Sequence, residues 1–168
     1  ELGVSIDAAM NLEDTKNKFK DRDLIYVTSA GAFVNETGKL PYLATTDEVI
    51  WSPTSARLFV DNTSMLLGND LSRLFPSFNL TNTLNDLPVK KVLTSPTISH
   101  TDEIDVSTLP ERSLLAENME MYYLKDAFKG AKSVKIIIGI TNSVGADAFA
   151  QYMKYKDQVA NMTARYVL

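Results

Sequence analysis

The sequence contains no cysteine and only one histidine among its 168 residues. Without cysteine, the chain can form neither a disulfide framework nor a thiolate metal site. A single histidine, His100, rules out a histidine-rich zinc site and makes a Ser-His-Asp triad difficult to build. We therefore expect no metal in the functional site.

Positive charge is also scarce. The 17 Lys and Arg residues are outnumbered by 21 Asp and Glu residues, which gives a formal net charge of −4, and Lys90-Lys91 is the only adjacent basic pair. A surface that follows nucleic-acid phosphates needs clustered basic residues, so we expect no nucleic-acid partner. No apolar run approaches the length of a membrane span, and no charged-then-apolar leader opens the sequence. We expect no membrane partner and a cytoplasmic location.

The remaining composition is that of one globular domain over residues 1–168, with 45% apolar and 23% charged residues. Two short apolar, β-branched runs, 23–31 and 134–140, predict strands buried on both sides. Amphipathic patterns predict helices over 5–20, 119–129 and 146–167. Alternation of such elements predicts an α/β fold.

The middle of the chain contains several strand patterns in succession, which favours a mixed sheet flanked by helices. Strands are expected over 44–51 and 89–97, and one bent or two short strands over 57–67. Residues 68–87, rich in Asn, Asp and Ser, predict an excursion with a weak helical turn, and 99–111 a polar loop.

Polar or small residues follow the apolar segments at three places. Thr141-Asn142-Ser143 ends the 134–140 run, Ser29-Ala30-Gly31 ends the 23–31 run, and Asn118-Met119-Glu120 opens the 119–129 helix. In open α/β sheets, ligands bind in the crevice outside the carboxyl ends of the strands. These residues are therefore predicted to share one pocket.

The order of these motifs carries a resemblance. The chain contains, in order, a helix with Asp-Ala-Ala, a strand ending in Ser-Ala-Gly, the sequence Glu-Asn-Met-Glu before a helix, and a strand ending in Thr-Asn. In this order the motifs resemble the nucleoside phosphorylase and nucleosidase superfamily, of the purine nucleoside phosphorylase-like type. Members of this family cleave the N-glycosidic bond of nucleosides. The resemblance implies that Ser29, Ala30 and Gly31 lie behind the base and ribose, and that Met119 and Glu120, with Asn118 beside them, bind the ribose. It implies that Asn142 faces the purine, and the Thr-Asn pair resembles the branch that acts on 6-oxopurines.

The sequence departs from the family pattern at the phosphate site. The family normally opens with a strand and a glycine-containing loop that contribute to that site. The resemblance implies that this chain starts after them, so a shortened N-terminal part is expected. Ala32 and Phe33 stand where the family has glycines, and Tyr122 and Tyr123 are bulkier than its usual residues. We expect weak dependence on phosphate, which is a possible co-substrate, and no other cofactor.

Two functions remain open. The first is cleavage of a purine nucleoside by phosphorolysis or hydrolysis, with Glu120 and Asn142 as catalytic residues. The alternative is a non-catalytic homologue that binds a nucleoside or has a structural role. Each motif also has a simpler interpretation: Glu120 as a carboxylate favoured by a helix dipole, Asn142 as a turn or capping residue, and Ser29-Ala30-Gly31 as a tight turn. The expected partners are a small-molecule nucleoside or base and further copies of the chain in a homo-oligomer.

Overall fold

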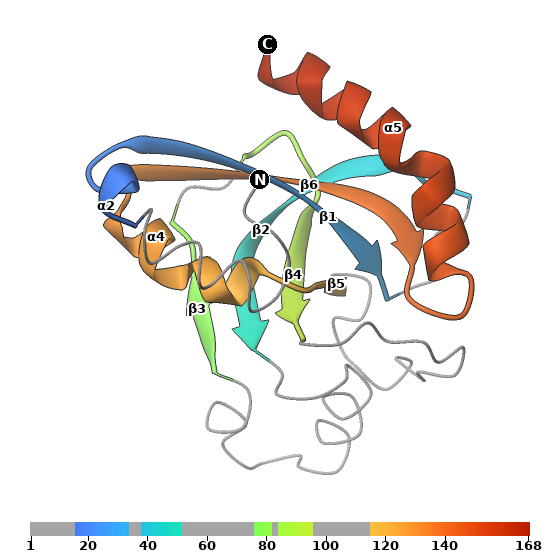
Figure 1. The fold of residues 1–168 in the computed structure, drawn as a ribbon, viewed down its shortest axis with the longest axis horizontal. Helices are drawn as coiled ribbons and strands as arrows, with labels where there is room; N and C mark the ends of the chain where they lie inside the picture. Colours follow the sequence, from blue (N-terminus) through green and yellow to red (C-terminus); the bar gives the residue numbers. More distant parts are fainter. Residues whose placement is uncertain (1–15, 34–37, 52–75, 82–83, 96–114) are drawn as a thin grey trace.

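The computed structural model describes residues 16–33, 38–51, 76–81, 84–95 and 115–168 (Figure 1). Of the helix expected over 5–20, only α2 (Lys16–Phe19) lies within these ranges. The expected strand region 57–67, the loop 99–111 and His100 lie outside the described residues, as does half of the 68–87 segment. The described half contains the short strand β3 (Ser77–Asn79), where an excursion with a weak helical turn was expected.

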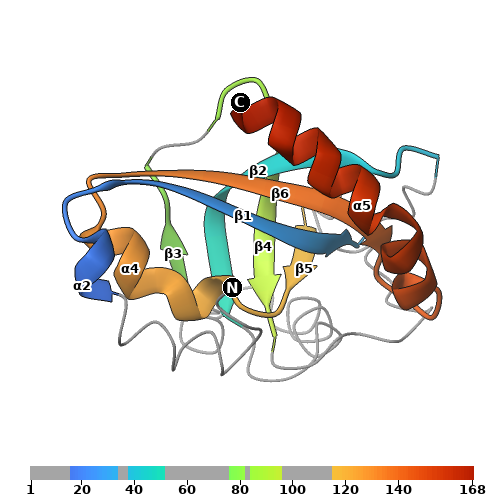
Figure 2. The same ribbon diagram turned by 45° about the horizontal axis from the view of Figure 1, so that its top comes forward.

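Six strands form one mixed sheet, as predicted. The strands are β1 (Asp23–Ala32), β2 (Tyr42–Trp51), β3 (Ser77–Asn79), β4 (Val89–Thr94), β5 (Leu115–Asn118) and β6 (Ser133–Ser143). Their order is β3-β2-β4-β5-β1-β6, and β2 also pairs with β6, so the sheet curls back on itself (Figure 2). β1 runs parallel to β6 but antiparallel to β5, and β2 runs parallel to β4 but antiparallel to β6.

Helices cover both faces of β6, which confirms the predicted arrangement. The long helix α5 (Ala148–Val167) packs on one face, and α4 (Lys125–Gly130) lies on the other (Figures 1 and 2). On the α5 side, a Cβ at Gly139 would run into the side chain of Val159, so glycine allows the helix to approach the strand closely. On the α4 side, the rings of Tyr26 and Phe128 meet edge to face, with centroids 5.4 Å apart. None of the helices in the described part of the chain is long and apolar enough to cross a membrane.

The two apolar runs differ in burial. In β6, the run from Ile136 to Ile140 is buried throughout, as expected. In β1, however, Ile25 is 51% exposed and Val27 is 47% exposed, so the prediction of burial on both sides was wrong for this strand. The exposed positions alternate with half-buried ones, so they share one face of the strand. Val27 pairs with Ile137, on the same face of the sheet as Gly139, which lies against α5. The helix packs on β6 and leaves this face of the first part of β1 uncovered.

The start of the predicted 119–129 helix also differs. The chain bends at Met119 and Glu120, continues as the 3-10 helix η4 (Met121–Leu124) and becomes α-helical only in α4. Asn118 causes this delay, because its Oδ1 accepts the backbone N–H groups of Glu120, at 2.9 Å, and Met121, at 2.8 Å. An asparagine that takes the N–H groups two and three residues ahead acts as the cap of the turn.

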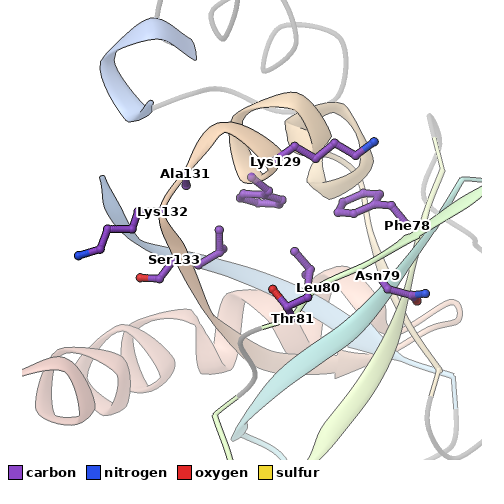
Figure 3. Close-up of a pocket in the computed structure, with 10 residues that line it drawn as sticks. Phe78, Asn79, Leu80, Thr81, Lys129, Ala131, Lys132 and Ser133 are labelled. Atoms are coloured by element: carbon purple, nitrogen blue, oxygen red, sulfur yellow. The ribbon is translucent and has the colours of Figure 1, made fainter. Parts of the chain in front are cut away.

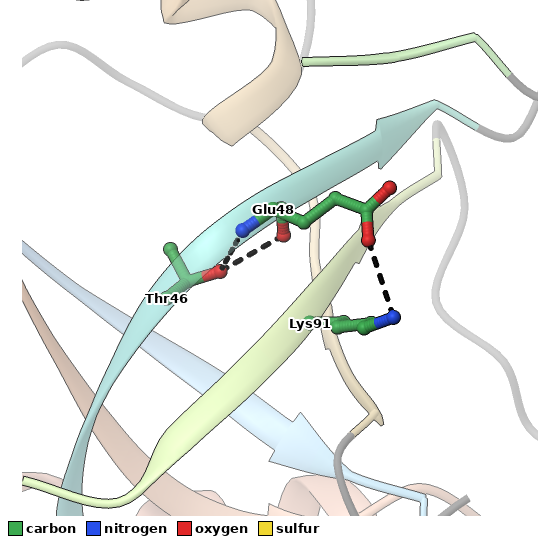
Figure 4. A network of polar contacts seen from close by, with 3 residues as sticks. All are labelled: Thr46, Glu48 and Lys91. Carbon is green, nitrogen blue, oxygen red and sulfur yellow. Dashed lines mark hydrogen bonds and ion pairs between the residues drawn. The ribbon is translucent and has the colours of Figure 1, made fainter. Parts of the chain in front are cut away.

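A bulge interrupts β2. The register between β2 and β4 shifts between Thr45 and Glu48, which marks a bulge. The Thr46 hydroxyl donates to the carbonyl of Glu48 at 2.8 Å and accepts the N–H of the same residue at 3.3 Å (Figure 4). Lys91 on β4 pairs with the Glu48 carboxylate at 3.4 Å (Figure 4). These contacts satisfy the backbone where the ladder is interrupted and keep β2 bent toward β6.

Candidate functional site

A cavity of about 380 Å³ lies where the ends of β1, β5 and β6 meet the beginning of α5. It combines several polar side chains from the strands with an apolar wall, the usual make-up of a small-molecule site. The lining residues are Ser29, Ala30, Gly31, Glu117, Asn118, Met119, Glu120, Thr141, Asn142, Val144, Ala148, Phe149 and Tyr152.

The structure brings all of the residues that the sequence suggested for the site to this one cavity. They are Ser29, Ala30, Gly31, Asn118, Met119, Glu120 and Asn142. Strand pairing explains the grouping, because Gly31 is in register with Asn142 on β6 and with Glu117 on β5. What each residue does toward a ligand remains a prediction.

Gly31 allows Asn142 to sit against β1. A Cβ at position 31 would lie 2.5 Å from Nδ2 of Asn142 and 3.3 Å from Cγ2 of Val144. The first distance is far below van der Waals contact, so any side chain at this position would push the amide out of place. The glycine is needed here for close packing.

Asn142 retains hydrogen-bonding capacity for a ligand. Its Oδ1 accepts from the Thr141 hydroxyl at 2.8 Å, and its Nδ2 donates to the carbonyl of Ser143 at 3.2 Å. An amide has two acceptor lone pairs and two N–H donors, so one of each remains. Asn142 does not cap α5, because that helix begins at Ala148 after Asp147. The capping interpretation of Asn142 is therefore wrong.

Glu120 also lines the cavity, and its carboxylate is part of a network of hydrogen bonds. Its Oε1 accepts from the Thr28 hydroxyl at 2.7 Å and from Nδ2 of Asn118 at 3.1 Å. The carboxylate makes no side-chain hydrogen bond to the start of η4. Burial raises the pKa of Glu120 above its usual value, while the bonds from Thr28, Asn118 and the Met119 backbone act in the opposite direction.

Tyr26 lies near this carboxylate on the same face of β1 as Thr28. Burial is the main reason why the pKa of Tyr26 is raised, and the negative charge of Glu120 raises it further. The phenol therefore stays neutral at physiological pH. Together these effects describe a partly desolvated acidic end of the cavity.

Several residues at the site were not predicted from the sequence. Thr28, which contacts Glu120, is part of an apolar run, and Glu117 lies within β5. Phe149 and Tyr152 form the apolar wall from α5, and Phe149 is 69% exposed. Their spacing of three residues places them on one face of the helix, which is the signal that could have identified them. Their exposure is compatible with the predicted self-association, which stays a prediction.

A second cavity, of about 240 Å³, lies between the end of β3 and the C-terminal end of α4 (Figure 3). Phe78 and Leu80 line it, and the labelled lysines, Lys129 and Lys132, extend away from its centre (Figure 3). Asn79, Thr81 and Ser133 also line it, but the larger cavity has carboxylates, those of Glu117 and Glu120, in its lining, so we take the larger cavity as the candidate site. Among the described residues, no group of three or more acidic or histidine side chains is arranged to hold a metal ion.

The fold is similar to that of solved MTA/SAH nucleosidases, which agrees with the resemblance that the motifs suggested. The sequence matches no protein-family model and no curated protein sequence. The similar solved structures include several nucleosidases. The MTA/SAH nucleosidase of Streptococcus pneumoniae, in complex with 8-aminoadenine, has a TM-score of 0.69 and 16% identity over 99% of this chain and 76% of that chain.

Two further structures show the same likeness. A mutant MTAN of Helicobacter pylori with 5′-methylthioadenosine in the active site has a TM-score of 0.67 and 12% identity, covering 98% of this chain and 74% of that chain. The MTAN of Chlamydia trachomatis has a TM-score of 0.60 and 14% identity over 87% of this chain. This chain spans 63% of the length of the Chlamydia protein. At these identities, the likeness establishes the fold.

Proposed function

We propose that the chain binds a purine nucleoside in the larger cavity and cleaves its N-glycosidic bond, with Glu120 on the ribose and Asn142 on the base. The observation that carries this proposal is the convergence of both side chains, from different elements, on one cavity backed by Ser29-Ala30-Gly31. The fold supports it, because the similar structures are named as nucleosidases and two of them hold 5′-methylthioadenosine or 8-aminoadenine.

The reaction explains the placement of the two groups. Breaking the bond builds positive charge on the sugar, as in glycoside hydrolysis, and negative charge on the departing base. The Glu120 carboxylate accepts hydrogen bonds from ribose hydroxyls and lies near the developing positive charge. The remaining N–H of Asn142 stabilises the base as it leaves. An amide does not titrate, so Asn142 acts as a hydrogen-bonding group and does not transfer a proton.

Water is the nucleophile that this cavity favours. Within its described lining, the charged side chains are the carboxylates of Glu117 and Glu120, and both repel an anion such as phosphate. The apolar wall of Val144, Phe149 and Tyr152 suits a flat or apolar part of the ligand. We therefore propose hydrolysis, with little or no dependence on phosphate.

The test is release of free base, followed by chromatography, from inosine, guanosine, adenosine and 5′-methylthioadenosine, with and without phosphate. Inosine and guanosine test the 6-oxopurine preference that Asn142 suggests. Glu120→Ala and Asn142→Ala should each lower the rate by about 100- to 1,000-fold, the typical effect of removing one electrostatic contact to a transition state. Asp157→Ala and Asn161→Ala, at exposed positions of α5, are matched controls that should retain the rate.

The outcomes separate the two functions. Undiminished release by Glu120→Ala contradicts the assigned mechanism. Absence of release from every nucleoside, together with a nucleoside-dependent rise in melting temperature, identifies a binding protein without catalysis. Absence of both effects rejects the nucleoside site.

A further inference from the structure

The Glu120 carboxylate is held by a chain of hydrogen bonds that includes Asn118 and Thr28. The backbone N–H groups bound by Asn118 fix which atoms of this chain donate and which accept. Oδ1 of Asn118 accepts two backbone N–H groups, those of Glu120 and Met121. A flipped amide would point its own N–H groups at these donors, so Nδ2 must lie on the other side. There its two protons are shared among three acceptors, the carbonyl of Ser29 at 2.9 Å, the Thr28 hydroxyl at 3.0 Å and Oε1 of Glu120 at 3.1 Å.

This direction decides what the Thr28 hydroxyl does. Nδ2 of Asn118 cannot accept a proton, so the hydroxyl proton of Thr28 goes to an oxygen, and Oε1 of Glu120 at 2.7 Å is closer than the Ser29 carbonyl at 3.4 Å. Hydrogen bonds from a hydroxyl to a carboxylate of this length are among the stronger ones in proteins. Thr28 does not line the cavity, so it acts on a ligand only through Glu120.

We propose that Thr28 is a positioning residue, whose hydroxyl fixes Oε1 of Glu120 and thereby presents the other carboxylate oxygen to the ligand in one orientation. The Thr28 proton goes to Oε1, and Nδ2 of Asn118 lies 3.1 Å from that same oxygen, so Oε2 is the atom that the carboxylate offers. Identification of the ligand as a nucleoside rests on the proposed function, but the contact between Thr28 and Glu120 does not.

Removal of the hydroxyl has a defined effect on protonation. The Thr28 bond lowers the pKa of Glu120 against the larger effect of burial, so its loss raises that pKa further. The other titratable groups of the site are Tyr26 on β1, Glu117 on β5 and Tyr152 on α5. They remain in place in a Thr28 variant, so a change in the titration of Glu120 reports on the hydroxyl. Hydrogen bonds from ribose hydroxyls are stronger to the charged carboxylate, so inosine binding weakens as the pH falls through the pKa of Glu120.

The experiment compares wild type, Thr28→Val and Thr28→Ser. Valine keeps the β-branched shape without the hydroxyl, and serine keeps the hydroxyl without the methyl group. The first measurement is a ¹³C NMR titration of the glutamate carboxyl carbons, with Glu120 assigned from the spectrum of Glu120→Gln. The second is calorimetric affinity for inosine and for hypoxanthine, its free base, over a range of pH.

Thr28→Val should raise the pKa of Glu120 and weaken inosine binding about tenfold, the effect of one hydrogen bond to a charged group. Hypoxanthine affinity should stay unchanged, because the base lies at the Asn142 part of the cavity. The low-pH loss of inosine binding should move to higher pH, and Thr28→Ser should restore wild-type behaviour in each measurement.

Two results would overturn the proposal. An identical Glu120 titration in wild type and Thr28→Val shows that the hydroxyl does not hold the carboxylate. Equal weakening of inosine and hypoxanthine shows a general distortion of the cavity. If wild type binds no inosine but the titration shifts in Thr28→Val and returns in Thr28→Ser, the contact is established and the nucleoside assignment fails.

Discussion

Replacement of Asn118 by alanine should destabilise the protein by about 2–4 kcal/mol, because this one buried side chain makes hydrogen bonds to several backbone groups. Asn118 is 3% exposed, and its Oδ1 accepts the N–H groups of Glu120 and Met121 at 2.9 and 2.8 Å. Its Nδ2 donates to the Ser29 carbonyl at 2.9 Å. A hydrogen bond contributes roughly 0.5–1.5 kcal/mol net, and a buried group left unsatisfied costs roughly 1–3 kcal/mol. The three lost bonds give the stated range.

Urea unfolding followed by circular dichroism measures this loss. At roughly 2–4 °C per kcal/mol for a chain of this size, the melting temperature should fall by about 5–15 °C. Asn161→Ala is the matched control: Asn161 is exposed on α5, and alanine is the better helix former. A difference below about 0.5 kcal/mol between the two variants, the usual limit for neutral surface changes, would refute the assignment of Asn118 as the support of this turn.

Two further predictions concern neighbouring positions. Gly31→Ala should displace the Asn142 amide, because the new Cβ would lie 2.5 Å from Nδ2, and calorimetry should show loss of base binding as well as lower stability. Glu120→Gln should be more stable than wild type at pH 8 but not at pH 4. The pKa of Glu120 is raised in the folded state, so the folded protein binds the proton of this carboxyl more tightly than the unfolded chain does. The stability gained from this proton is present below the unfolded pKa and disappears as the pH rises through the folded pKa. Urea unfolding at the two pH values checks this sign, and a stabilisation that grows toward acid pH contradicts it.

The long elements of the fold could be predicted from the sequence, and the short ones could not. β6, with 11 residues, follows from an apolar run, and α5, with 20 residues, follows from an amphipathic pattern. β3 and β5 have three and four residues, too few for periodicity to be visible. They exist because neighbouring strands supply hydrogen-bonding partners, which is a tertiary effect. The exposure of Ile25 is also a tertiary effect, since it depends on which strands α5 covers.

The site divides in a similar way. Glu120 and Asn142 could be singled out because they follow or precede strong local patterns and resemble family motifs. Thr28 could not, because its partners are 90 and 92 residues away in the sequence. Phe149 and Tyr152 reach the cavity only because Gly139 lets α5 lie close to β6. Sequence patterns therefore located the groups suited to chemistry, whereas packing determined which residues support and enclose them.

The environment of Glu120 is difficult to explain by stability alone. Burial opposes the charged carboxylate, and the donors from Thr28, Asn118 and Met119 only act against that effect, since its pKa remains raised. A neutral side chain of similar size would avoid this desolvation, and buried charges are often replaceable by such residues without loss of stability. A desolvated carboxylate, held by specific donors at the wall of a cavity, is instead typical of groups arranged to bind or react. The cost in stability and the fixed orientation both fit a carboxylate that receives hydrogen bonds from a ligand.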